Sequence, residues 1–218
     1  MTGFDLALFT AVFVTFFVVI DPIGVAPIFA GLTAGTSGRH RRIMAIKSVI
    51  VATVVLVGFA YGGEWLMGAL GVSLDAFRAA GGVLLFLIAL DMIFEKRTER
   101  REERAEKLSE EHRAEHPDGA YDDISVFPIA IPMLAGPGAI ASAMLFMSES
   151  AGDLARQGVV MSAMALNLVF CLVLFLAIGP LMRLLGDTLA AMVTRILGVI
   201  LAALAAQFIF DGIAGALL

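Results

Sequence analysis

The chain has 218 residues, of which 60% are hydrophobic and only 16% are charged. A soluble domain is about 45–50% apolar and about 25% charged, so this composition excludes an ordinary soluble protein and indicates a polytopic membrane protein surrounded by lipid. The net charge of −5 does not describe a charged surface that attracts partners, because 11 of the 20 acidic and 7 of the 15 basic residues lie in one segment, 95–123. We expect no nucleic-acid partner.

Apolar runs of the length that crosses a bilayer, about 17–25 residues, recur along the chain. Hydropathy predicts six spans, at residues 5–34, 43–66, 76–94, 124–148, 158–182 and 189–217. The segment 95–123 mixes both signs of charge densely, and we expect a solvated linker there. The predicted fold is an all-α integral membrane protein, whose single membrane domain consists of two three-helix halves, 1–94 and 124–218.

The first span contains a proline-rich break, which follows the fifteen-residue apolar run Leu6–Ile20 and reads Asp21-Pro-Ile-Gly-Val-Ala-Pro27. Proline removes a backbone donor and clashes with the carbonyl four residues back, so we expect Pro22 and Pro27 to interrupt the helix. Asp21 follows about 22 Å of helix, which is short of the ~30 Å hydrocarbon core. It therefore lies within the membrane thickness.

Two roles are open for Asp21, and both can hold at once. Asp21 can cap a half-helix that begins at Pro22, because proline is favoured in the first helical position. It can also bind the substrate or a coupling ion, since charges inside a membrane are expensive and suggest function. Gly24 lets the backbone approach a ligand closely.

The third span begins near Arg78 and contains Gly81 and Gly82, small residues that allow helices to pack closely. We expect Arg78 to extend to the membrane interface or pair with lipid headgroups, and keep it as a secondary substrate-binding candidate. His112 and His116 in the linker lie four positions apart. No cysteine or further histidine lies nearby in the sequence to complete a site, so we expect no metal.

The fourth span holds the second break, Pro132-Met-Leu-Ala-Gly-Pro-Gly138. Pro132 and Pro137 repeat the Pro-x4-Pro spacing of the first break 110 residues later. Gly136 and Gly138 serve helix packing or backbone contact with a ligand, and the prolines beside them favour the ligand. Paired breaks in corresponding halves are the best sequence pointer to a transporter's binding site.

The last two spans carry two further secondary candidates, Asn167 and Arg195. We expect Asn167 to form an interhelical hydrogen bond and Arg195 to extend to the interface. Arg195-x2-Gly198 repeats Arg78-x2-Gly81 at an offset of 117 residues. Related halves with an odd number of spans must be inverted in the membrane. We therefore predict two inverted repeats, with broken helices 1 and 4.

The distribution of basic residues predicts the orientation. Of the 15 basic residues, 13 lie on the face that receives the linkers after spans 1, 3 and 5, and only Arg78 and Arg156 lie on the other. By the positive-inside rule, both termini lie outside the cytoplasm and segment 95–123 lies inside.

Three segments, Asp21–Phe29, Phe77–Leu90 and Phe127–Ile140, closely resemble the signature segments of the MarC family. This family is also known as the neutral amino acid transporter (NAAT) or SnatA-like family and is grouped with LysE-like exporters. The resemblance covers essentially the whole chain, in order and at the expected distances. It implies a six-span protein of the bacterial inner membrane, and some members are linked to transport of small neutral amino acids such as glycine and alanine.

We therefore expect a secondary transporter, an exporter of small neutral amino acids that works by alternating access. The half-helix N–H groups with Gly136 and Gly138 would receive the substrate carboxylate, and Asp21 the ammonium group or a coupling H⁺ or Na⁺. We expect no enzyme and no cofactor, since the sequence has no Walker A, H-E-x-x-H or G-x-S-x-G motif. An ion or small-solute channel and a non-transporting membrane sensor remain alternatives. A homo-oligomeric assembly is open as well.

Overall fold

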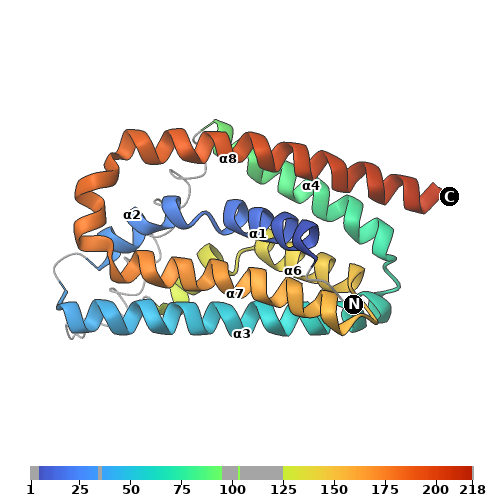
Figure 1. The fold of residues 1–218 in the computed structure, drawn as a ribbon, viewed down its shortest axis with the longest axis horizontal. Helices are drawn as coiled ribbons and strands as arrows, with labels where there is room; N and C mark the ends of the chain where they lie inside the picture. The colour runs from blue at the N-terminus through green and yellow to red at the C-terminus, as the bar shows by residue number, and fades with distance from the viewer. Residues whose placement is uncertain (1–4, 34–35, 95–102, 104–124, 218) are drawn as a thin grey trace.

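The computed structural model describes residues 5–33, 36–94, 103 and 125–217, and every element in these ranges is helical. Figure 1 shows them as an elongated bundle. The elements are α1 (Leu6–Ile20), α2 (Pro22–Leu32), α3 (Gly38–Leu70), α4 (Leu74–Ile93), η1 (Ser125–Leu134), α6 (Pro137–Glu149), α7 (Leu154–Leu176) and α8 (Ile178–Leu217). The predicted linker 95–123, with His112 and His116, lies outside the described residues apart from Glu103.

Within the described residues, five segments are long and apolar enough to cross a membrane. The pair η1–α6, bent by 57°, becomes a sixth if it counts as one span. The first break lies within a single candidate span, since Leu6–Leu32 forms one apolar segment of 27 residues. The predicted all-α membrane fold is confirmed.

Two predicted boundaries are wrong, because hydropathy detects lipid contact and not helix ends. The second span was expected at 43–66, but α3 runs from Gly38 to Leu70. Ser37 caps its start by accepting from His40 N at 3.2 Å, and Gly71 ends it with a positive φ of 67°. The expected break between residues 182 and 189 is also absent, since the backbone of α8 is helical there.

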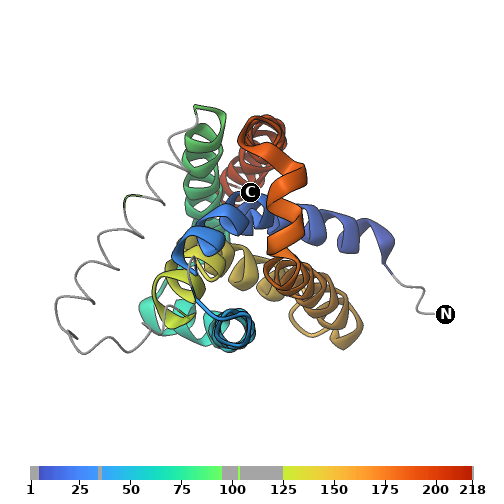
Figure 2. The ribbon, with the colours of Figure 1, turned by 90° about the vertical axis from the view of Figure 1, so that its left-hand side faces the viewer.

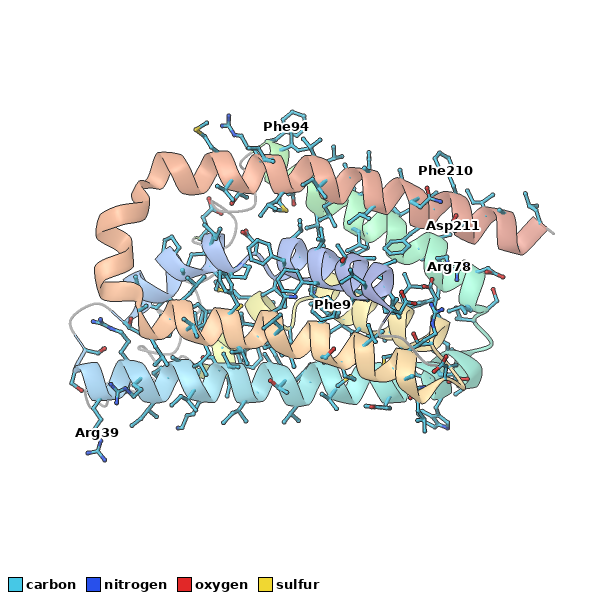
Figure 3. All side chains as sticks on the ribbon, viewed as in Figure 1. Phe9, Arg39, Arg78, Phe94, Phe210 and Asp211 are labelled. Atoms are coloured by element: carbon cyan, nitrogen blue, oxygen red, sulfur yellow. The ribbon has the colours of Figure 1, made fainter. Side chains whose placement is uncertain are left out.

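The bundle has two ends, which Figure 3 marks by the labels of Arg39 and Arg78. We call them the Arg39 end and the Arg78 end. Helix α1 begins and α8 finishes toward the Arg78 end, and the α3–α4 and α6–α7 turns also lie there (Figure 1). Successive spans therefore run in opposite directions.

The two breaks lie in the middle of the bundle, between the longer helices, while the start of α1 projects outward toward the N-terminus (Figure 2). Their burial agrees with this position, since Phe16, Ile20 and Leu134 are fully buried. Phe29 of α2 stacks on Phe175 of α7, with ring centroids 4.4 Å apart. Hydrocarbon gives apolar helices no hydrophobic reason to associate, so close packing of this kind must hold the breaks in place.

Helices α4 and α8 make the most extensive helix–helix contact in the described structure, and glycines permit it. A Cβ on Gly82 would lie 2.8 Å from the Ala205 carbonyl oxygen, and a Cβ on Gly198 would lie 2.9 Å from Met92 Cβ. Real Cβ atoms do not approach so closely, so glycine is required at both positions. The contact is reciprocal, because each helix places a glycine from its middle part against a later part of the other.

We expect Gly82→Ala to lower the midpoint of thermal unfolding. The new methyl group overlaps the Ala205 carbonyl and Ile209, and overpacking of this kind costs about 1–3 kcal/mol. Gly81→Ala is the matched control, since a Cβ there would meet no atom within 4 Å. Alanine also favours helix by about 1 kcal/mol over glycine. Circular dichroism melting in detergent measures both, and equal midpoints for the two variants would contradict the packing argument.

Candidate functional site

The first break is the single residue Asp21, which lies between α1 and α2. Its backbone is left-handed, with φ 56° and ψ 64°, a conformation that aspartate tolerates better than most residues. Its N–H donates to the Phe17 carbonyl at 3.0 Å, and its own carbonyl accepts from Val25 N at 3.0 Å. One residue thus ends α1 and starts α2, and Pro22 follows in the first helical position, where its missing N–H is no loss.

The Asp21 carboxylate caps α2 from within the protein. Asp21 is only 1% exposed, and its Oδ1 accepts from Gly24 N at 3.1 Å. The predicted cap is confirmed. The same carboxylate explains why residue 24 is a glycine, because a Cβ there would collide with Asp21 Oδ2 and lie 2.8 Å from Asp21 Cγ. A carboxylate in this place is stabilised by the positive end of the helix dipole.

Pro27 does not break α2, so this part of the prediction is wrong. The helix continues from Pro22 to Leu32 with Pro27 inside it. Helices α7 and α8 pack against this short element and hold it helical. Membrane helices tolerate proline when neighbouring helices support the backbone in this way.

The second break is longer and begins within η1. Phe127 and Ile131, which each precede a proline, are extended, with φ −121° and ψ 131° at the first and φ −125° and ψ 122° at the second. Proline imposes such a conformation on the residue before it. Both X–Pro peptide bonds are cis. Regular helix resumes only at Pro137, with Gly136 as its N-cap.

Pro22 and Pro137 are equivalent in the structure, because each proline occupies the first position of a half-helix. These residues are 115 positions apart, instead of the 110 that separate Pro22 from Pro132. Pro132 follows the extended Ile131 within η1, five residues before α6 begins. The offset of 115 lies closer to the 117 between Arg78 and Arg195.

The start of α6 differs from the other described helix starts with an assigned N-cap, because no side chain caps it. Gly136 has no side chain to offer, and Pro137 has no N–H. The amides of Gly138 and Ala139 lie in the first helical turn and have no intrahelical acceptor. Such a helix start attracts a carboxylate or another anion. The N-caps of the other helices are Asp5, Asp21, Ser37, Ser73 and Asp153.

Packing of α6 against α1 brings the two breaks together. A Cβ on Gly138 would lie 2.9 Å from Val19 Cγ1 and 2.6 Å from Ile88 Cδ1. The first turn of α6 therefore lies against the last turn of α1, next to Asp21. From the breaks, α2 runs toward the Arg39 end and α6 toward the Arg78 end (Figure 1). Two positive helix ends thus approach the middle of the bundle from opposite sides.

Asn167 of α7 fixes α1 near the first break. The residue is fully buried, and its Nδ2 donates to the Phe13 carbonyl at 3.1 Å and to the Ala163 carbonyl at 3.0 Å. The predicted interhelical hydrogen bond is confirmed. Phe13 lies about two helical turns before Ile20, so Asn167 acts on the path of α1 and not on the break itself.

Arg78 forms ion pairs at its end of the bundle. Its Nε donates to Glu149 Oε1 at 2.9 Å, and its Nη1 lies 3.5 Å from Asp75 Oδ1. Glu149 ends α6, at the opposite end from Pro137. The sequence does not predict this partner, because Glu149 borders a polar loop and lies 71 residues from Arg78 in the chain. Arg195 is exposed on α8.

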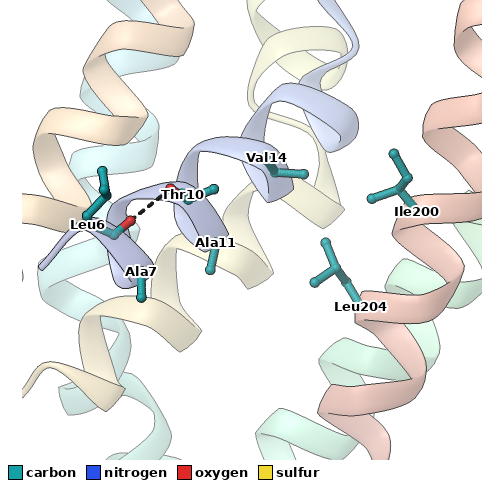
Figure 4. A pocket seen from close by; sticks show the side chains of 7 residues that line it. All are labelled: Leu6, Ala7, Thr10, Ala11, Val14, Ile200 and Leu204. Atoms are coloured by element: carbon teal, nitrogen blue, oxygen red, sulfur yellow. Dashed lines mark hydrogen bonds between the residues drawn. The ribbon is translucent and has the colours of Figure 1, made fainter.

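A groove of about 710 Å³ lies between α1 and α8, and Figure 4 shows its lining. Its residues are Leu6, Ala7, Thr10, Ala11, Val14, Ile200 and Leu204. The Thr10 hydroxyl donates to the Leu6 carbonyl at 2.8 Å, so it is already engaged. This apolar lining suits lipid chains and not an amino acid. Among the described residues, no group of three or more His, Cys, Asp or Glu is arranged to hold a metal ion.

Comparison with known proteins identifies the family. A family model described as "MarC family integral membrane protein" matches residues 6–217. UPF0056 membrane protein MJ1677 of Methanocaldococcus jannaschii is 38% identical over 216 residues, covering 98% of this chain and 100% of that protein. UPF0056 membrane protein YhcE of Escherichia coli is 31% identical, covering 98% and 95%. YvbG of Bacillus subtilis is 32% identical, covering 94% and 93%. No solved structure matches.

We expect Asp21→Ala to destabilise the protein more than Asp21→Asn. Asparagine keeps an acceptor for Gly24 N and tolerates the left-handed backbone. Alanine loses the cap and adds backbone strain, at about 1 kcal/mol or more each. Asp5→Ala is the control, because Asp5 caps α1 by accepting from Leu8 N at 2.9 Å with a negative φ of −74°. Thermal melts compare the three variants, and a larger loss for Asp5→Ala than for Asp21→Ala would refute the strained double role of Asp21.

Proposed function

We propose that this chain, which belongs to the MarC family of integral membrane proteins, is a secondary transporter of small neutral amino acids. One observation carries the proposal. Two half-helices start in the middle of the bundle, and Asp21 caps one while the other has no side-chain cap. An amino acid carries a carboxylate and an ammonium group on adjacent atoms, which is the charge pattern that complements these two helix starts.

In this proposal the substrate carboxylate accepts hydrogen bonds from the amides of Gly138 and Ala139. The ammonium group lies near Asp21, whose carboxylate is the one charged side chain among the buried residues described by the structure. Charge-assisted hydrogen bonds of both kinds are stronger in a low dielectric than in water. A coupling H⁺ or Na⁺ would share the same carboxylate.

Close packing around Gly138 supports a small substrate. Val19, Leu85 and Ile88 all approach the place where a side chain at this position would lie. Leu85 and Val19 are almost fully buried. Glycine and alanine add the least volume beside these side chains, so we place them first among the substrates.

Two features support inverted halves and alternating access, the transport cycle that such repeats serve. The first is the equivalence of Pro22 and Pro137 as half-helix starts. The second is the reciprocal glycine contact between α4 and α8, which is what a two-fold relation between the halves would give. The positive-inside rule places the Arg39 end in the cytoplasm of a bacterial cell, and we propose export as the direction.

A channel is the second candidate, because paired broken spans also build pores. The burial of Asp21, at 1% exposure, argues for a carrier with a closed site. Saturable exchange of labelled amino acid across liposomes would favour the carrier, and single-channel currents would favour the pore.

We expect Asp21→Asn to lower alanine exchange in proteoliposomes by about two orders of magnitude or more, since an unpaired ammonium in a buried site costs about 3–5 kcal/mol. Asp211→Asn is the matched control, because Asp211 is exposed on α8 and accepts from Gln207 Nε2 at 2.7 Å. Glycine or alanine should raise the thermal midpoint of the natural protein and not that of Asp21→Asn. Alanine exchange at the natural rate by both Asp21→Asn and Gly138→Val would contradict this assignment of the substrate site.

A further inference from the structure

One face of α6 follows α4 from the second break to the Arg78 end. Its members recur at spacings of four, three and four residues, which places them on the same side of the helix. They are Gly138, Ser142, Leu145 and Glu149. We call this face, with the part of α4 opposite to it, the α4–α6 seam.

Contacts at both ends define the seam. Near the break, a Cβ on Gly138 would lie 2.6 Å from Ile88 Cδ1 and 3.5 Å from Leu85 Cδ2, both on α4. At the Arg78 end, Arg78 Nε donates to Glu149 Oε1 at 2.9 Å. Because the two helices are antiparallel, these contacts bring the whole length of α6 against α4.

The middle of the seam holds a polar group that the closed packing leaves unsatisfied. Ser142 is fully buried, and its Oγ has no hydrogen-bond partner among the described residues. Two other fully buried hydroxyls are satisfied, since Thr15 donates to the Ala11 carbonyl and Ser48 to the Met44 carbonyl, both at 2.8 Å. The buried Ser150 hydroxyl shares the condition of Ser142, but it lies after the end of α6 and outside the seam. An unpaired buried hydroxyl costs about 1–3 kcal/mol, and entry of water removes this cost.

The α4 side of the seam leaves room near its middle. Gly81 lies three residues after Arg78 and four before Leu85, on the face of α4 that meets α6. It is buried, yet a Cβ there would meet no atom within 4 Å. The seam thus combines local space with an unpaired hydroxyl, between an ion pair and the break.

We propose that the α4–α6 seam is the water path between the Arg78 end and the substrate site, closed in this structure, and that the Arg78–Glu149 ion pair is its latch. The inference rests on the proposed transport function. Separation of α6 from α4 breaks the ion pair, hydrates both charges and gives the Ser142 hydroxyl water partners. These gains offset the lost contacts, so a second state is accessible.

The latch differs from an ordinary surface ion pair. Its side chains are 21% and 24% exposed, and it joins residues 71 positions apart on two different halves of the chain. At the same end of the bundle, Arg156 and Asp5 lie 3.9 Å apart with 45% and 38% exposure. Exposed pairs of that kind contribute little. Arg156 and Asp5 therefore provide the natural comparison.

The test is a thiol-labelling measurement on the full chain in lipid nanodiscs. Cys171, the single cysteine, is replaced by alanine, and Ser142→Cys then places a thiol of nearly the same size in the seam. A water-soluble maleimide labels it slowly while the latch is intact. We expect Arg78→Gln and Glu149→Gln each to accelerate labelling about tenfold, which corresponds to about 1.4 kcal/mol in the opening equilibrium.

Three controls separate a latch from a general loss of stability. The exchanged pair Arg78→Glu with Glu149→Arg restores slow labelling. Arg156→Gln leaves labelling unchanged. A thiol introduced by Ser48→Cys, equally buried but in α3, labels no faster in the Arg78→Gln background. Unchanged labelling of the Ser142→Cys reporter in both latch variants, or equal acceleration at Ser48, would overturn the proposal.

The measurement needs no substrate, so its outcome is independent of the substrate assignment. Accelerated labelling in a protein that exchanges no neutral amino acid would count against the proposed function alone. Normal exchange with unaltered labelling would count against the seam alone. A further readout of the latch is the exchange rate, which Arg78→Gln should change while the exchanged-pair variant returns it toward the natural value.

Discussion

Backbone polar groups inside a bilayer must find their partners within the protein, because hydrocarbon offers none. An unbroken helix satisfies this condition by itself, and a broken one does not. The breaks at Asp21 and Gly136 are therefore the features that the rest of the bundle must support. At the first break, one aspartate supplies an N–H to end α1, a carbonyl to start α2 and a carboxylate to cap it. Asn167 fixes the path of α1 about two helical turns before this break, and helices α7 and α8 pack against α2 after it.

At the second break, no side chain pairs with the first backbone N–H groups of α6. The two halves therefore differ in how their half-helix starts are capped. Gly136 allows the chain to turn close to the Pro132 carbonyl, but it supplies no cap for α6. Two equivalent helix starts with unequal capping produce a dipolar environment. A symmetric pair of capped starts would repel a carboxylate, and a symmetric uncapped pair would offer nothing to an ammonium group. The asymmetry fits a zwitterion better than a simple anion or cation.

Local chemistry made part of this predictable from the sequence. The number of spans follows from hydropathy, and the Asp21 cap follows from an aspartate directly before a proline. Whether a proline breaks a helix depends on its neighbours, so Pro27 was misjudged while Pro22 and Pro132 were not. The Arg78–Glu149 pair was beyond reach, because its partners are 71 residues apart and only packing brings them together. The missing cap at Gly136 became visible only once the start of α6 was known.

The placement of α6 connects the chemistry at the break to the far end of the bundle. Its 13 residues form a helix about 20 Å long, which carries the uncapped amides at one end and Glu149 at the other. Both ends of α6 contact helix α4, and α4 packs closely on α8 at Gly82 and Gly198. Helix α6 therefore packs against a unit of two helices, α4 and α8, and not against α4 alone. The proposed ligand site at the start of α6 and the ion pair at its end therefore belong to one helix, so the proposal predicts that a change at either one affects the other.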